Sequence, residues 1–214
     1  AEMGNSQLRP EYTNQYDVGL AYKSRTRRGL LTEWAVQVDG YLNTVHDKIV
    51  AYPKGAQFRW TMLNLGRVHV KGIDATASLT VNPVRELFIT THLQYTYQEA
   101  IDVTNPSDTY YRDQIPYIPW HSGSATVQAV WRSWNMNYSF IYTGERYNQQ
   151  ENIVYNHTQP WYTSDLSLSK EFSWSRYTAR VQLEVNNLFS QDYDVILNYP
   201  MPKRNYRVTL MFEL

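Results

Sequence analysis

Apolar and polar residues alternate with a period of two along most of the chain. Between residues 177 and 186 the alternation has no exception, because single polar residues separate Tyr177, Ala179, Val181, Leu183 and Val185. The 3.6-residue repeat of an amphipathic helix is not sustained over any long segment. Since successive side chains of a β-strand point to opposite faces of a sheet, the pattern predicts an all-β protein built from two-faced strands.

The alternating segments number about nine, and most are longer than the usual strand of about 5–6 residues. One of them is irregular, because the apolar positions of segment 67–81 change parity at Gly72, which we interpret as a bulge or a glycine kink. The expected strands are 14–23, 32–43, 67–81, 87–98, 122–132, 135–144, 162–172, 177–186 and 205–214.

The links between these strands are alternately short and long. Short links lie at 24–31 and near Asn82, Ser133 and Ser175, whereas long links cover 44–66, 99–121, 145–161 and 187–204. In an antiparallel meander this order brings every short link to one end of the sheet and every long link to the other. Short turns on one side and long loops on the other are typical of a transmembrane up-and-down β-barrel.

Aromatic residues favour the same architecture. The chain contains 19 Tyr and 7 Trp, and every Trp lies near the end of an expected strand, as an interfacial aromatic girdle requires. The tryptophans are Trp34, Trp131, Trp134 and Trp174 beside short links, and Trp60, Trp120 and Trp161 beside long ones.

Composition narrows the classes of function. Lys plus Arg equals Asp plus Glu at 20 each, so no nucleic-acid partner is indicated. The absence of cysteine excludes disulfides, thiolate metal sites and a cysteine nucleophile. No run of about 18 apolar residues is present, so a membrane-spanning helix is not expected. The mean hydropathy of −0.56 is that of a polar protein, and alternation alone leaves a soluble β-sandwich open as an alternative.

Nine antiparallel strands do not close into a regular barrel by themselves, because the first and last would run parallel. We therefore expect residues 1–214 to be the C-terminal portion of a larger barrel. The outer edges of segments 14–23 and 205–214 would then pair with strands outside this sequence.

The C-terminal stretch "VNNLFSQDYDVILNYPMPKRNYRVTLMFEL" resembles the ending of TonB-dependent outer-membrane receptors. "LRPEYTNQYDVGLAY", "DGYLNTVHDKIV" and "NLGRVHVKGIDA" resemble further strands of that family, and "IPYIPWHSGSA" is similar to the point where a strand re-enters the barrel after a long loop. Together these motifs extend over nearly the whole chain in the order that the family has. "ILNYPMPKRN" resembles receptors of Bacteroidetes related to cobalamin, iron-chelate or haem uptake. Cobalamin is the first expectation, and the carbohydrate-transporting receptors of the same bacteria are the next.

The resemblance implies a barrel of roughly 22 strands with a plugged lumen, placed in the outer membrane of a Gram-negative bacterium. It implies energy-coupled uptake of a scarce nutrient, such as cobalamin, an iron chelate or haem. It also implies a set of partners: outer-membrane lipid, the plug domain and the earlier strands, the TonB–ExbB–ExbD motor acting on an N-terminal TonB box, and a surface lipoprotein. The plug and the TonB box are absent from this sequence. Its nine strands would be the last nine of the roughly 22 in the family's barrel.

Transport requires polar and aromatic groups that face the lumen and the outer loops, without a catalytic constellation or a cofactor. By strand parity the candidate lumen-facing residues are Gln37, Asp39, His92, Gln94, Gln128, Arg180, Gln182 and Glu184. The candidate ligand-binding residues in the long loops are Tyr110, Tyr111, Arg112, Trp120, Arg146, Tyr147, Gln149, Gln150, Tyr155, Tyr193 and Tyr199.

Other functions receive less support from the sequence. The five histidines have no metal-ligand spacing, so no metal site and no enzyme are expected. A passive porin-like or structural barrel is one alternative, although no loop carries the opposed charges of a porin constriction. A soluble carbohydrate-binding β-module is another, although it would place tryptophans on one sheet face instead of at strand ends.

Overall fold

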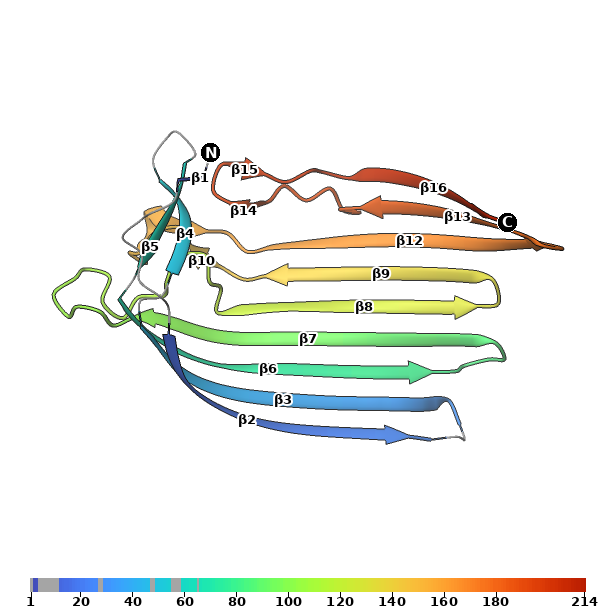
Figure 1. The fold of residues 1–214 in the computed structure, drawn as a ribbon, viewed down its shortest axis with the longest axis horizontal. Helices are drawn as coiled ribbons and strands as arrows, with labels where there is room; N and C mark the ends of the chain where they lie inside the picture. The colour runs from blue at the N-terminus through green and yellow to red at the C-terminus, as the bar shows by residue number, and fades with distance from the viewer. Residues whose placement is uncertain (1, 4–11, 27–28, 47–48, 55–58, 65) are drawn as a thin grey trace.

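A computed structural model describes residues 2–3, 12–26, 29–46, 49–54, 59–64 and 66–214. Nine long strands form one antiparallel sheet in which each strand pairs with its predecessor and its successor among the nine (Figure 1). The strands are β2 (Tyr12–Arg25), β3 (Leu31–His46), β6 (Arg67–Val81), β7 (Leu87–Asp102), β8 (His121–Trp131), β9 (Trp134–Thr143), β12 (Trp161–Trp174), β13 (Tyr177–Asn186) and β16 (Asn205–Glu213). The nine-stranded up-and-down sheet expected from the alternation is therefore confirmed.

The links are sorted between the two ends of the sheet as expected (Figure 1). The short links after β2, β6, β8 and β12 lie at one end, together with the C-terminus, and the long loops lie at the other. The loops contain short elements that the alternation did not predict: β4 (Ile49–Lys54), β5 (Arg59–Asn64), β10 (Arg146–Tyr147), η1 (Val154–Asn156), β11 (His157–Thr158), β14 (Asp194–Ile196) and β15 (Tyr199–Pro200). The further strand β1 (Glu2–Met3) pairs with β5. Within the described residues, no helix has the length and apolar character needed to cross a membrane.

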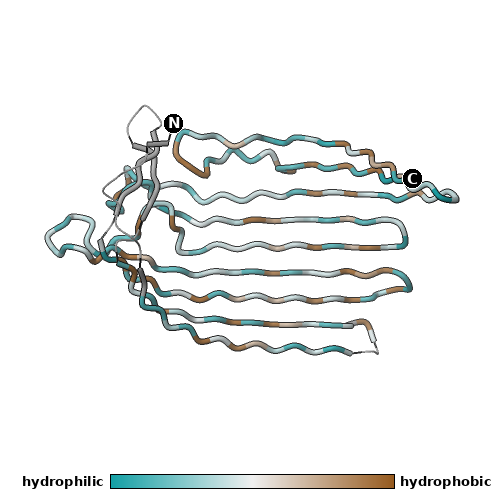
Figure 2. Tube along the Cα trace, in the orientation of Figure 1, coloured by the Kyte–Doolittle hydropathy of each residue, from teal (hydrophilic) through white to brown (hydrophobic). Residues whose placement is uncertain are grey.

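The register separates the residues of the large sheet into two faces. Ala77 of β6 pairs with Val36 and Leu93, whereas its neighbour Thr76 pairs with Gln37 and Gln94. We call the two sides the apolar face and the polar face. Leu20, Val208 and Leu183 on the apolar face are 78%, 66% and 49% exposed. In Figure 2 hydrophobic and hydrophilic positions follow one another along the long strands.

The tryptophans next to the short links lie on the apolar face. Trp131 pairs with Trp134 across the β8–β9 turn, and Trp174 pairs with Tyr177 across the β12–β13 turn. At the loop end the girdle prediction is wrong, because Trp161 lies on the polar face and Trp120 packs against a loop tyrosine. The apolar face carries tyrosines there instead, among them Tyr95 and Tyr162. The side chain of Trp60 and residues 8–11 of the family motif lie outside the described part.

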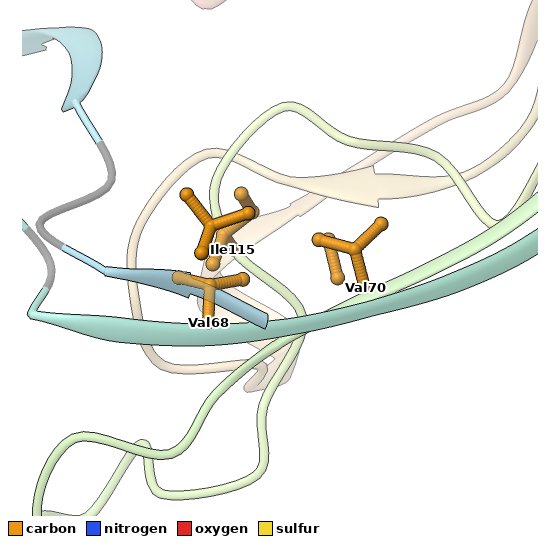
Figure 3. Packing of buried hydrophobic residues seen from close by; sticks show 5 residues of the cluster. Val68, Val70 and Ile115 are labelled. Carbon is orange, nitrogen blue, oxygen red and sulfur yellow. The ribbon is translucent and has the colours of Figure 1, made fainter. Parts of the chain in front are cut away.

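The parity change at Gly72 does not come from a bulge, so the first of the two interpretations is wrong. The pairing of β6 with β3 and with β7 runs through Gly72 without interruption. Val68 and Val70 share the polar face with Thr76, but Ile115 from the loop after β7 covers them (Figure 3). Near the loops, therefore, the polar face is covered and carries apolar residues, whereas the other face is exposed and carries polar ones. Glycine is needed at position 72 because a Cβ there would overlap the backbone carbonyl oxygen of Tyr97 on the neighbouring strand.

The buried apolar core is small and lies where the loops cover the polar face. It contains Val45, Val68, Val70, Ala100 and Ile115, and the sheet beyond it is open on both faces. A sheet that exposes large apolar side chains along most of one face is not the structure of a soluble sandwich.

Candidate functional site: the loop end and the polar face

The loop after β7 and the loop after β9 are joined by a reciprocal pair of hydrogen bonds. The backbone N–H of Gln114 donates to Oδ1 of Asn152 at 2.7 Å, and Nδ2 of Asn152 donates to the carbonyl of Gln114 at 2.9 Å. The N–H of Asn152 also donates to a carboxylate oxygen of Asp113 at 2.9 Å. These contacts fix the relative position of two loops that are far apart in sequence.

The side chain of Gln114 is 1% exposed and is bonded to the end of strand β7. Its Oε1 accepts from the N–H of Ala100 at 2.8 Å, and its Nε2 donates to the carbonyls of Gln98 and Ile118 at 3.1 and 3.2 Å. A buried amide with these partners is satisfied, so it holds the loop over the core.

Arg146 joins the loop after β9 to the last loop. The residue is 2% exposed, and its guanidinium donates to the carbonyls of Asp194 and Val195 at 2.7 and 2.8 Å. Burial lowers the pKa of this guanidinium, while the charges of Tyr117 and Asp194 raise it. The sequence singled out Arg146 as a ligand-binding candidate, but in this arrangement its charge is directed to backbone carbonyls.

Asn187 organises the last loop from the end of β13. Its backbone has φ of 52°, a left-handed conformation that asparagine adopts more readily than most residues. Its Nδ2 donates to the carbonyls of Gln191 and Pro202 at 2.9 and 3.1 Å, and its Oδ1 accepts from the N–H of Gln191 at 2.9 Å. Its own N–H donates to Asp165 at 2.8 Å. This residue belongs to the "NNLF" motif but is not one of the loop candidates predicted from the sequence.

A hollow of about 380 Å³ lies between the loop after β9 and the last loop. One wall contains Trp161 and Tyr193, whose rings stack with centroids 4.6 Å apart. Burial raises the pKa of Tyr193, and the carboxylate of Asp165 raises it further. The lining also includes His157, whose Nε2 lies 3.0 Å from a carboxylate oxygen of Glu145. Stacked rings with polar groups around them suit a flat or polycyclic polar ligand.

The other loop candidates are spread over the loop end. Tyr147 packs edge-on against Trp120, with ring centroids 5.9 Å apart, and the Arg112 guanidinium lies 5.7 Å from the ring centre of Tyr111. Tyr155 is 90% exposed and lies in η1. Tyr110, Gln149 and Gln150 are half-buried and Tyr199 is exposed. Among the candidates only Tyr193 lines the hollow, and the sequence missed Trp161 and His157 because their proximity depends on loop folding.

All eight candidates assigned to the lumen by parity lie on the polar face. Gln37 pairs with Thr76, His92 with Thr126, and Arg180 with Met211. A second hollow, of about 650 Å³, lies over the middle of this face and is lined by Gln37, His92 and Gln94. Neighbouring polar side chains bond to one another, as when Nε2 of Gln182 donates to Glu184 at 2.6 Å. Lys23 has the same strand parity as these candidates and also lines the second hollow, but it was not among the predicted lumen-facing residues.

Metal binding is not indicated in the described part of the chain, where no three His, Asp or Glu side chains come together. The groups available for binding are the polar side chains on the polar face of the sheet and the aromatic and charged side chains of the long loops.

A sheet of long antiparallel strands with an apolar and a polar face, short turns at one end and joined loops at the other, defines part of an outer-membrane β-barrel. Residues 1–188 match the family described as TonB dependent receptor-like, beta-barrel, and the chain belongs to this family. Proteins of the family lie in the outer membrane of Gram-negative bacteria and are transporters, not enzymes.

Individual relatives are distant. The chain is 23% identical over 215 residues to the vitamin B12 transporter BtuB of Photobacterium profundum, covering 99% of this chain and 32% of that protein. It superposes on the ferric citrate transporter FecA with a TM-score of 0.70 at 15% identity, covering 95% of this chain and 32% of the other. For the ferric-catecholate receptor Fiu of E. coli K12 the TM-score is 0.66 at 18% identity, covering 98% and 29%. The chain thus spans about a third of the length of these relatives.

Proposed function

We propose that this chain forms the last nine strands of a plugged barrel that takes up a scarce organic nutrient by coupling to TonB. The main support is the pair of open edges at β2 and β16 in a sheet whose two faces differ in polarity. Each backbone group left unpaired in hydrocarbon costs several kcal/mol, so both edges require partner strands. In this arrangement the apolar face meets lipid, the polar face lines the lumen and contacts the plug, and the long loops lie outside the cell.

The transported ligand is proposed to be a corrinoid of the cobalamin type, with a ferric chelate or haem as the second choice. The first is supported by the Photobacterium profundum relative, which is a vitamin B12 transporter. The second is supported by the two structural relatives, a ferric citrate transporter and a ferric-catecholate import receptor. The hollow between the last two loops, with the stacked Trp161 and Tyr193, would contact one part of such a ligand. Family membership argues against the soluble sugar-binding module and the passive pore.

Ligand titrations of the purified full-length receptor test this assignment. We expect cyanocobalamin to bind more tightly than haemin or ferric citrate, measured by the quenching of tryptophan fluorescence and by calorimetry. Since an aromatic contact contributes about 0.5–1.5 kcal/mol, Tyr193→Ala should weaken binding about 2–10-fold. The matched control is Tyr177→Ala, which removes a tyrosine at the turn end of the sheet. Tighter binding of haemin or ferric citrate would mean that the ligand is not a corrinoid. Unchanged affinity in Tyr193→Ala would mean that the hollow is not part of the binding site.

A further inference from the structure

Two hollows lie at opposite ends of strand β12. The hollow between the loop after β9 and the last loop, here called the loop hollow, is lined by Trp161 at the start of β12. The turn-end hollow has a volume of about 400 Å³ and is lined by Ser169, Glu171 and Arg180, together with the link between β8 and β9. Since Trp161 and Ser169 are eight positions apart, about 27 Å of strand separates the hollows. This distance is close to the height of about 25 Å that the apolar band of an outer-membrane barrel has.

The polar face between the two hollows carries almost no charge. Strands β8 and β9 contain no Asp, Glu, Lys or Arg. Between the hollows, β12 has one charged side chain on the polar face, Asp165, whose carboxylate accepts the N–H of Asn187 at 2.8 Å. We call the hydroxyl and amide side chains of this region the neutral wall. They are Asn135, Asn137 and Ser139 on β9 with Thr163, Ser167 and Ser169 on β12.

The strands at both edges of the sheet carry charges on the polar face instead. On β2 and β3, Glu33 forms ion pairs with Lys23 and Arg25 at 3.1 and 3.3 Å. On β13 and β16, Glu184 and Arg207 occupy directly opposite positions of the ladder. Hydrogen bonds to ionised groups are about twice as strong as those between neutral groups, so the edge strands can hold a plug more firmly than the neutral wall can.

The side chains of the neutral wall are loosely bonded to their neighbours. Nδ2 of Asn137 and Nε2 of Gln128 both donate to Oδ1 of Asn135, at 3.3 and 3.4 Å. At the charged edge, Nε2 of Gln182 donates to Glu184 at 2.6 Å. A solute passes along a pore when each site binds it well enough for entry and weakly enough for release. The neutral wall meets this requirement better than the charged strands do.

We propose that the nutrient crosses the lumen along the neutral wall, entering at the loop hollow and leaving at the turn-end hollow. This inference rests on the proposed function, because it assumes a plugged barrel whose loop end lies outside the cell. The plug keeps its contacts with the charged edge strands, while water and the nutrient replace its weaker contacts with the neutral wall. At the turn-end hollow, Glu171 supplies an acceptor and Arg180 supplies donors for polar groups of the nutrient.

The second hollow, of about 650 Å³, is the competing route over the polar face. Its lining extends from β2 to β8 and includes the charged Lys23. No residue of the short turns contributes to this lining, so the second hollow is a recess in the middle of the face. The turn-end hollow, in contrast, includes Arg132 and Ser133 of the β8–β9 turn and therefore reaches the end of the sheet.

Uptake by cells that carry the full-length receptor tests the route. Ser139 of the neutral wall and Ser78 of the second hollow are both half-buried and lie in one row of the sheet, three strands apart. We expect Ser139→Trp to reduce TonB-dependent uptake at least about tenfold, because a large apolar ring narrows and dewets a passage. The matched control, Ser78→Trp, should leave uptake within about twofold of the unmodified receptor, since its ring would lie outside the passage.

The nutrient used is cyanocobalamin, haemin or ferric citrate, whichever the unmodified receptor binds most tightly. Binding to the cell surface should be equal in both variants and in the unmodified receptor, and heat-modifiable migration on gels should show that each is a folded barrel. Uptake by Ser139→Trp that equals or exceeds uptake by Ser78→Trp would overturn the route. Uptake by the unmodified receptor in cells without TonB would instead contradict the proposed function.

Thiol labelling tests the same route without blocking it, and it applies even if Ser139→Trp does not fold. In Ser139→Cys, a membrane-impermeant maleimide should react faster during energised uptake than after the proton gradient is collapsed. In Ser78→Cys the two rates should be equal. Equal rates in Ser139→Cys, or an energy-dependent rate in Ser78→Cys alone, would overturn the route.

Discussion

At the scale of single residues, Asn187 has more influence on the loop end than its size suggests. The side chain accepts one hydrogen bond and donates two within the last loop, and the backbone has a left-handed conformation. Since alanine would lose all three bonds and would also be strained in this conformation, Asn187→Ala should destabilise the loop by about 2–4 kcal/mol.

Hydrogen exchange of the full-length receptor measures this effect. In Asn187→Ala the peptide covering 187–204 should exchange at least tenfold faster than in the unmodified receptor, while β8 and β9 should be unchanged. The control is Asn187→Gly, which relieves the strain but still lacks the side chain. In this variant the exchange rate of the same peptide should lie between those of Asn187→Ala and the unmodified receptor. Unaltered exchange in both variants would mean that the loop is held by other contacts.

At the scale of elements, the difference between the two faces of a strand decides which substitutions the barrel tolerates. Leu183 and Gln182 are neighbours on β13, and they point to the apolar face and the polar face. An arginine facing lipid near the middle of the bilayer costs about 2–4 kcal/mol, whereas one facing the lumen remains hydrated.

Equilibrium unfolding of the full-length receptor in lipid vesicles compares an arginine at position 183 with an arginine at position 182. Leu183→Arg should lose about 2–4 kcal/mol of unfolding free energy, and Gln182→Arg less than about 1 kcal/mol. The opposite order, or equal losses, would mean that the faces are assigned the wrong way round.

The elements that the sequence predicted correctly are those whose residues carry a repeating pattern. Nine strands were identified from the alternation, and the polarity of each face followed from the same parity. The environment at the loop end was not predicted, since Val68 and Val70 are buried only because Ile115, more than forty positions later, covers them. For the same reason the sequence could not distinguish Arg146, buried against carbonyls, from the exposed Tyr155. Short pairs such as β10 with β11 lack enough residues to show a period.

At the scale of the whole molecule, the sorting of links gives the sheet a direction across the membrane. The long loops share one end and the short turns share the other (Figure 1). We expect an epitope tag inserted at Asp108 of the full-length receptor to be labelled on intact cells. A tag at Asn82 should be labelled only after the outer membrane is made permeable. Equal labelling of both tags on intact cells would contradict the transmembrane orientation, and a tagged protein in the soluble fraction would contradict the barrel.

The buried contacts between loops bear on how the exterior of this receptor is recognised. Gln114 and Asn152 join two loops, and Arg146 joins the second of these to the last loop. With the loop end outside the cell, as proposed above, an antibody or a bacteriophage that approaches the cell would meet a conformational epitope assembled from these three segments. Recognition of this kind is lost on denaturation and is not reproduced by a synthetic peptide from a single loop. Transfer of the binding surface to another barrel would require the three loops to be moved together.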